Sequence, residues 1–174
     1  VLTDERAGIR RALQFLREKG HRRIGFLSFQ DEKASLANER RVRAFTEESG
    51  GLAGIEPELP PPTLPVTDAV CAILEKRCSA LIIAGEGYEG PVLRTLAMLG
   101  KRIPEDLSVI TYETPESCFR TPRQTTIGQD FPAIAAAAFH LLETMVKGET
   151  HHPAPVEIPP VFTVRESVGP FPLS

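Results

Sequence analysis

Apolar positions along this chain alternate between helical spacing and strand-like runs. Between residues 4 and 19, the apolar side chains of Ile9, Ala12, Leu13 and Leu16 recur at i, i+3, i+4 and i+7, which predicts a helix with one buried face. Helices are also predicted over residues 35–49, 68–77, 91–99 and 130–147. Short apolar runs predict strands at residues 24–29, 80–84 and 107–112, with two short strands around 156–158 and 161–164.

One stretch between these elements is rich in proline. Residues 54–65 are expected to be irregular rather than a central strand, because proline cannot donate a hydrogen bond to a strand ladder. The remaining strands and helices alternate, and this order predicts an α/β fold with a parallel sheet and helices on both faces. Ligands of such sheets bind at the carboxyl ends of the strands.

Composition and charge narrow the classes of function. The chain has 174 residues, 41% of them hydrophobic and 25% charged, which suits one globular core or two small lobes. Its net charge of -3 argues against tight nucleic-acid binding by this chain. Three cysteines without a C-x-x-C motif favour reduced thiols in the cytoplasm, and no run reaches the roughly 18 to 20 apolar residues of a membrane span. The histidines suggest no metal site.

A glycine-rich loop follows the predicted strand at residues 80–84. Residues 85–90 read G-x-G-x-x-G and precede a predicted helix, as in dinucleotide-binding sites. However, Glu86 and Glu89 would repel a pyrophosphate, so the glycines are better explained by a loop with positive φ. No cofactor and no catalytic residue is predicted. A nicotinamide-dependent enzyme using this loop remains the least favoured alternative.

Five phrases, in order along nearly the whole chain, resemble the effector-binding core of the lactose-repressor (LacI) family of bacterial transcriptional regulators. They are residues 20–26 (GHRRIGF), 41–45 (RVRAF), 103–110 (IPEDLSVI), 125–131 (TTIGQDF) and 164–167 (VRES). The resemblance implies the second half of a sensor domain of the periplasmic-binding-protein type, in which two Rossmann-like lobes joined by three crossovers hold a small effector between them.

The resemblance also implies a domain organisation and a set of partners. Residues 1–127 form the C-terminal lobe, residues 128–158 are a crossover and a helix that belongs to the other lobe, and residues 159–174 return to the first lobe. The implied protein is a cytoplasmic homodimer that senses a sugar-like metabolite, and it reaches operator DNA through a helix-turn-helix domain absent from this chain. A periplasmic sugar-binding protein, which shares the two-lobe fold, is the alternative.

Five residues are carried over as effector contacts. Arg41 offers paired donors to a sugar diol or a carboxylate, and Glu113, where the family usually has aspartate, accepts hydrogen bonds from ligand hydroxyls. Phe131 stacks near the ligand, while Ser35 and Asn38 contribute from the turn before the second helix. The resemblance predicts that the first two and this turn lie within reach of one ligand. Without it, Arg41 is an ordinary surface arginine and Phe131 a packing residue.

The last predicted helix raises a separate expectation. Its apolar residues follow helical spacing and would be exposed if the chain folded as a lone lobe. We therefore expect this stripe to pack against the same lobe or against a second copy of the chain. The residues concerned are Ile134, Ala138, Leu141, Leu142 and Met145.

Overall fold

A six-stranded sheet forms the centre of the protein. The computed structural model describes residues 1–29, 36–85, 87–112, 119–148 and 154–171. The strands lie in the order β3-β2-β4-β5-β6-β8, and all neighbours are parallel except β6 and β8. Their bounds are β2 Arg23–Leu27, β3 Glu56–Glu58, β4 Ala80–Ile83, β5 Ser108–Tyr112, β6 Thr125–Gly128 and β8 Val161–Thr163.

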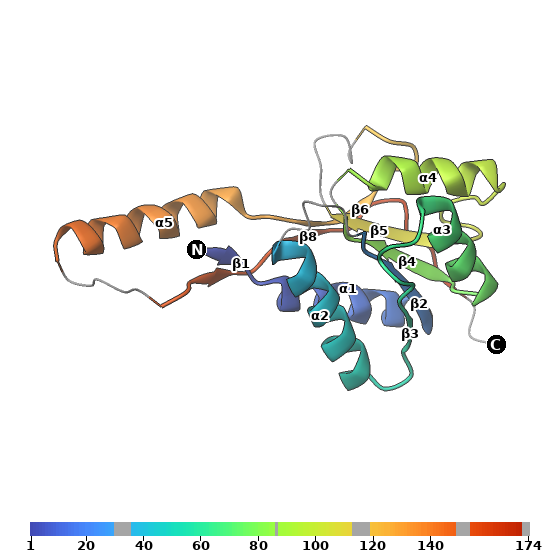
Figure 1. The fold of residues 1–174 in the computed structure, drawn as a ribbon, viewed down its shortest axis with the longest axis horizontal. Helices are drawn as coiled ribbons and strands as arrows, with labels where there is room; N and C mark the ends of the chain where they lie inside the picture. Colours follow the sequence, from blue (N-terminus) through green and yellow to red (C-terminus); the bar gives the residue numbers. More distant parts are fainter. Residues whose placement is uncertain (30–35, 86, 113–118, 149–153, 172–174) are drawn as a thin grey trace.

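Two pairs of helices cover the two faces of this sheet (Figure 1). Helices α1 (Glu5–Glu18) and α2 (Leu36–Gly51) pack together on one face, and α3 (Val66–Glu75) and α4 (Glu89–Met98) pack together on the other. Each predicted helix is therefore present, with ends shifted by up to two residues. The α/β class with helices on both faces is confirmed.

Alternate residues of the inner strands supply two separate cores. In β4, Ala80 and Ile82 face the α1 and α2 layer, while Leu81 and Ile83 face α3 and α4. All four are buried, as expected for a parallel strand covered on both faces. Gly25 of β2 makes room for α3, because a Cβ atom there would lie 2.6 Å from Ile73.

Two details of the sheet differ from the sequence prediction. Residues 54–65 are not wholly irregular, because β3 pairs in parallel with β2; Pro57 is tolerated since β3 is an edge strand and only one side of it needs a ladder. The sheet is also not wholly parallel, because β8 returns antiparallel to β6.

The polar strand β6 is braced by the residues that follow β8. The Arg165 guanidinium donates to Thr126 Oγ1 at 2.9 Å, and the Arg165 amide donates to Thr125 Oγ1 at 3.0 Å. Ser167 Oγ accepts from the Thr125 amide at 2.8 Å and donates to the carbonyl oxygen of Val109 at 2.6 Å. These bonds satisfy hydroxyl groups that would otherwise be costly to bury. Arg165 and Ser167 of the VRES phrase thus hold the segment after β8 against β6 and β5.

Helix α5 (Phe131–Val146) extends away from the body of the protein as an arm (Figure 1). Asp130 caps it by accepting a hydrogen bond from the Ala133 amide at 3.0 Å. Alongside the arm, β1 (Leu2–Thr3) pairs with β7 (Glu157–Ile158) in a separate two-stranded sheet. No residue of α5 is buried, so the expectation that its apolar stripe packs against the same lobe is wrong. Helices α1 to α4 already cover both faces of the sheet, so the cores of the lobe do not need α5.

Candidate functional site

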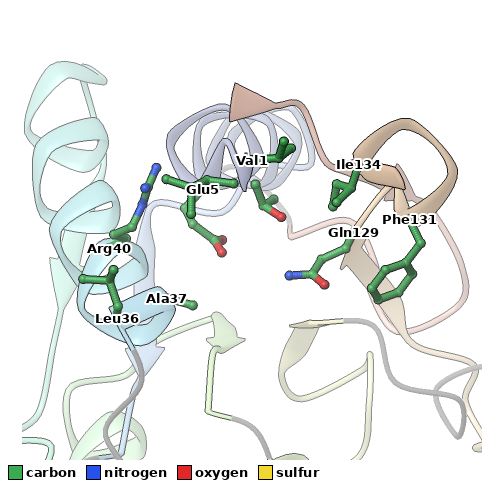
Figure 2. Close-up of a pocket in the computed structure, with 10 residues that line it drawn as sticks. Val1, Glu5, Leu36, Ala37, Arg40, Gln129, Phe131 and Ile134 are labelled. Atoms are coloured by element: carbon green, nitrogen blue, oxygen red, sulfur yellow. The ribbon is translucent and has the colours of Figure 1, made fainter. Parts of the chain in front are cut away.

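A pocket of about 270 Å³ lies where α1, α2 and α5 begin (Figure 2). It sits at the carboxyl edge of the sheet, because α2 follows the end of β2 and α5 follows the end of β6. Polar groups are few and the wall is mostly apolar, as is typical of small-molecule sites. The lining residues are Val1, Leu2, Thr3, Glu5, Leu36, Ala37, Arg40, Gln129, Phe131 and Ile134.

Helix starts place the polar side chains of this pocket. Asp4 caps α1 by accepting from the Ala7 amide at 2.9 Å, so Glu5 occupies the first helical position. Gln129 lies between β6 and the Asp130 cap of α5. Figure 2 shows the Glu5 carboxylate and the Gln129 amide pointing into the same space from opposite sides.

A buried ionic cluster lies directly behind the pocket. Arg41 Nε is 3.2 Å from Glu5 Oε2, and both side chains are at most 5% exposed. The Arg41 guanidinium donates to the carbonyl oxygen of Ala84 at 3.2 Å and lies 3.8 Å from the centre of the Tyr112 ring. An arginine over an aromatic face gains a cation–π attraction. Arg41 is therefore fixed by an anion from α1, a carbonyl group just after β4 and a ring from β5.

Tyr112 adds a neutral polar group to this cluster. Burial, and next the nearby Glu5 carboxylate, raise the pKa of Tyr112 well above its usual value, although Arg41 opposes the shift. The phenol therefore stays protonated at neutral pH, and the net charge of the cluster comes from Glu5 and Arg41 alone.

On the outer side of the pocket, Arg40 forms an ion pair with Glu157 of β7. Gln129 is exposed, and its side-chain amide makes no hydrogen bond within the described part of the chain. Its amide can both donate and accept, so it is available to ligand hydroxyl groups. The pocket can accordingly hold a small molecule that combines an apolar face with hydroxyls.

The five predicted contacts fall in different places. Phe131 lines the pocket and is 67% exposed, so it is not a core residue. Arg41 does not line the pocket and reaches it only through Glu5, while the buried Asn38 donates to the carbonyl oxygen of Phe29 at 3.0 Å. Ser35 and Glu113 lie outside the described residues.

Sequence reasoning missed Glu5, Arg40 and Gln129. Glu5 precedes Ile9 by four residues and therefore falls on the apolar face of α1, where a carboxylate is unusual. That position was the available signal for a charged group with a buried partner. Gln129 belongs to the TTIGQDF phrase, but no periodicity marks it.

Packing explains part of the glycine loop. The Tyr88 ring stacks on Phe29 with 4.2 Å between centroids, and a Cβ atom at Gly85 would lie 2.9 Å from Tyr88. Gly87 has a φ of +78°, which glycine adopts readily. Glu89 is buried and its Oε1 lies 3.1 Å from Arg120 Nε. These glycines therefore have a structural explanation without a phosphate ligand.

The structure also bears on two other classes of site. Within the described ranges, no group of three histidine, cysteine or acidic side chains is placed to hold a metal ion. The described helices include none with the length and apolar character needed to cross a membrane.

Comparisons with known proteins agree on one family. A model described as the periplasmic binding protein-like domain matches residues 13–168. The transcriptional regulator MalR of Streptomyces coelicolor is 26% identical over 182 residues, covering 99% of this chain and 52% of that protein. The transcriptional repressor PurR of Vibrio vulnificus is 29% identical over 165 residues, covering 90% of this chain and 49% of that protein.

Solved structures give the same result. A complex of the transcriptional regulator CelR with cellobiose has a TM-score of 0.75 and 26% identity, covering 95% of this chain and 52% of that chain. The chain thus spans about half the length of the curated relatives it matches. By the match of its residues 13–168, the chain belongs to the periplasmic binding protein-like domain family, and the relatives named here are transcriptional regulators.

Proposed function

We propose that this chain binds a small, polar, sugar-like effector in the pocket at the carboxyl edge of its sheet, as the non-enzymatic sensor of a bacterial transcriptional regulator. The observation that carries this proposal is the pocket itself, where Glu5 lies on one side and Gln129 and the exposed ring of Phe131 lie on the other. Sugar rings offer hydroxyl groups to such polar side chains and an apolar face to an aromatic ring. The CelR relative bound to cellobiose supports the choice of a sugar.

The proposed mechanism is a shift of population. The effector binds more tightly to one arrangement of this lobe and its partner lobe, and it thereby changes the fraction of dimers able to bind operator DNA. The proposal assigns residues 1–127 and 159–174 to one lobe and residues 128–158 to the other, with DNA contacted by a domain outside this chain. It also takes the protein to be a cytoplasmic homodimer. The curated relatives, which are transcriptional regulators, favour this over a periplasmic carrier.

The experiment is a titration of the isotope-labelled chain with cellobiose, followed by NMR. Saturable shifts are expected at the amides of Ala37, Gln129 and Ile134, which surround the pocket. Phe131→Ala should weaken binding at least fivefold, because it removes the aromatic wall. Phe139→Ala is the matched control, since this ring is 64% exposed on the same helix but does not line the pocket.

A second set of probes covers other sugars: glucose, ribose and lactose are titrated in the same way. Shifts confined to residues away from the pocket, or no saturable response to any of these sugars, would contradict the proposal. Equal losses from the two phenylalanine variants would argue that the pocket is not the site.

A further inference from the structure

Glu5 is the most unusual residue of the pocket, because its one carboxylate both lines the pocket and pairs with a buried arginine. Its backbone lies in the first turn of α1, its residue is only 3% exposed, and its Oε2 pairs with Arg41 Nε at 3.2 Å. The same side chain lines the pocket and points into it (Figure 2). A ligand in the pocket therefore meets a carboxylate before it can reach the arginine.

Arg41 is poorly placed to receive an anion. Its Nε faces Glu5, one Nη donates to the Ala84 carbonyl oxygen, and its plane lies over the Tyr112 ring. An anionic ligand that drew Arg41 away from Glu5 would leave the Glu5 carboxylate buried without its counter-ion. Such a buried, unpaired charge is strongly unfavourable.

Arg40, the arginine that lines the pocket, is also paired. It lies beside Glu157, and its side chain is 29% exposed. Glu5, Arg40, Arg41 and Glu157 thus contribute two negative and two positive charges. A carboxylate or phosphate entering this region would lose its hydration without gaining a cation in return.

We propose that Glu5 makes this pocket selective for neutral polyhydroxylated ligands and against sugar acids and sugar phosphates. The inference rests on the proposed function and adds the chemical class of the effector. Glu5 accepts a ligand hydroxyl while it holds Arg41 in place, so it acts both as a ligand contact and as a positioning residue. A neutral sugar donates hydroxyl protons to Glu5 and exchanges hydrogen bonds with Gln129, and neither contact disturbs the ion pairs.

The test compares neutral sugars with charged counterparts of similar shape. The chain is titrated by NMR with glucose and glucuronate, ribose and ribose 5-phosphate, and cellobiose and cellobionate. It carries an N-terminal acetyl group throughout, because Val1 lines the pocket and a terminal ammonium would add a cation there. For the pair that binds most tightly, the neutral sugar should bind at least tenfold better than its acid.

A substitution then assigns this preference to Glu5. Glu5→Gln keeps the shape but leaves Arg41 without its anion, so the preference for the neutral sugar should fall by about tenfold or reverse. Glu18→Gln, which changes an exposed carboxylate on the same helix, should leave the preference unchanged. Circular dichroism shows whether Glu5→Gln folds. If it does not fold, the titrations of the unsubstituted chain still test the selectivity by themselves.

The possible outcomes separate the two proposals. Equal or tighter binding of the charged member of a pair would overturn the selectivity while leaving a sugar-binding function intact. A folded Glu5→Gln variant with the original preference would remove Glu5 from the explanation. The absence of any saturable binding, neutral or charged, would contradict the sugar-binding function and the selectivity with it.

Discussion

Helices α1 and α2 are joined by ion pairs in two places that differ in their access to water. Near the pocket, Glu5 and Arg41 pair with side-chain exposures of 4% and 5%. Farther along, Glu48, whose side chain is 9% exposed, pairs with Arg6 and Arg10, whose side chains are 59% and 48% exposed. The same two helices thus carry one sealed pair and one solvated cluster.

The difference indicates what each contact contributes. Exposed pairs are screened by water and salt and contribute at most about 1 kcal/mol, whereas breaking a sealed pair leaves an uncompensated charge. The solvated cluster is an ordinary surface contact that helps to hold the two helices together. The sealed pair costs desolvation, and a cost of that kind is often accepted where conformational specificity or function requires it.

The largest effect is expected for Arg41→Met, which breaks the sealed pair. Glu5 would remain buried without a counter-ion, and the free energy of unfolding should fall by about 3–5 kcal/mol. Urea denaturation measures the loss. The double variant Glu5→Leu, Arg41→Met should recover most of it, because two apolar side chains replace two charges. If the double variant were as unstable as the single one, desolvation would not be the dominant cost.

A smaller effect is expected for Glu48→Gln in the solvated cluster. The hydrogen bond from Arg10, and then Arg6, lower the pKa of Glu48 from 4.5 to about 2 against the opposing effect of burial. Since the folded-state pKa is depressed, this carboxylate stabilises the fold above pH 4.5, and the contribution is lost as the pH falls from 4.5 to 2. The substitution should cost about 1 kcal/mol at pH 7, because the two arginine partners are solvated and water screens the pairs.

Denaturation curves at pH 7 and pH 3 provide the measurement. The difference between the original chain and Glu48→Gln should shrink at the lower pH. Glu166, whose pKa is lowered by Arg123, contributes the same background to both proteins and cancels. A difference that stayed constant from pH 7 to pH 3 would show that packing, rather than charge, accounts for the role of Glu48.

The smallest effect is expected for Arg43→Ala, which removes an exposed pair within α2. Arg43 and Glu47 lie at i and i+4, with side-chain exposures of 81% and 39%. The change in unfolding free energy should be within about 0.5 kcal/mol and should vanish in 1 M salt. A loss above 1 kcal/mol in denaturation experiments would break the proposed relation between exposure and contribution.

Most of the fold follows from apolar spacing, and the exceptions have physical reasons. The runs at β2, β4 and β5 are buried on both faces, so they are continuous and easy to recognise. Strand β6 has the same burial but begins with two threonines, whose hydroxyls accept hydrogen bonds from Arg165, about 40 residues later in the chain. No local pattern can reveal partners at that distance.

The candidate site was less predictable than the fold. The family resemblance singled out Phe131, which lines the pocket, and Arg41, but an alignment of phrases gives no information about which partner an arginine contacts. The pairing of Arg41 in α2 with Glu5 in α1 joins residues 36 positions apart in the chain. It depends on how the two helices cross. Glu5 itself was detectable only as a charge on an apolar helix face.

The antiparallel pairing of β6 with β8 makes the projecting arm a topological insertion into a β-hairpin. Gly128 and Val161 are partners in the ladder, so the chain leaves the sheet and re-enters it at adjacent points. A short turn joining these two residues would close the hairpin without reordering any strand of the sheet. One wall of the pocket is therefore separable from the folding of this lobe: Gln129, Phe131 and Ile134 would leave with the insertion, while every residue of the two cores would stay.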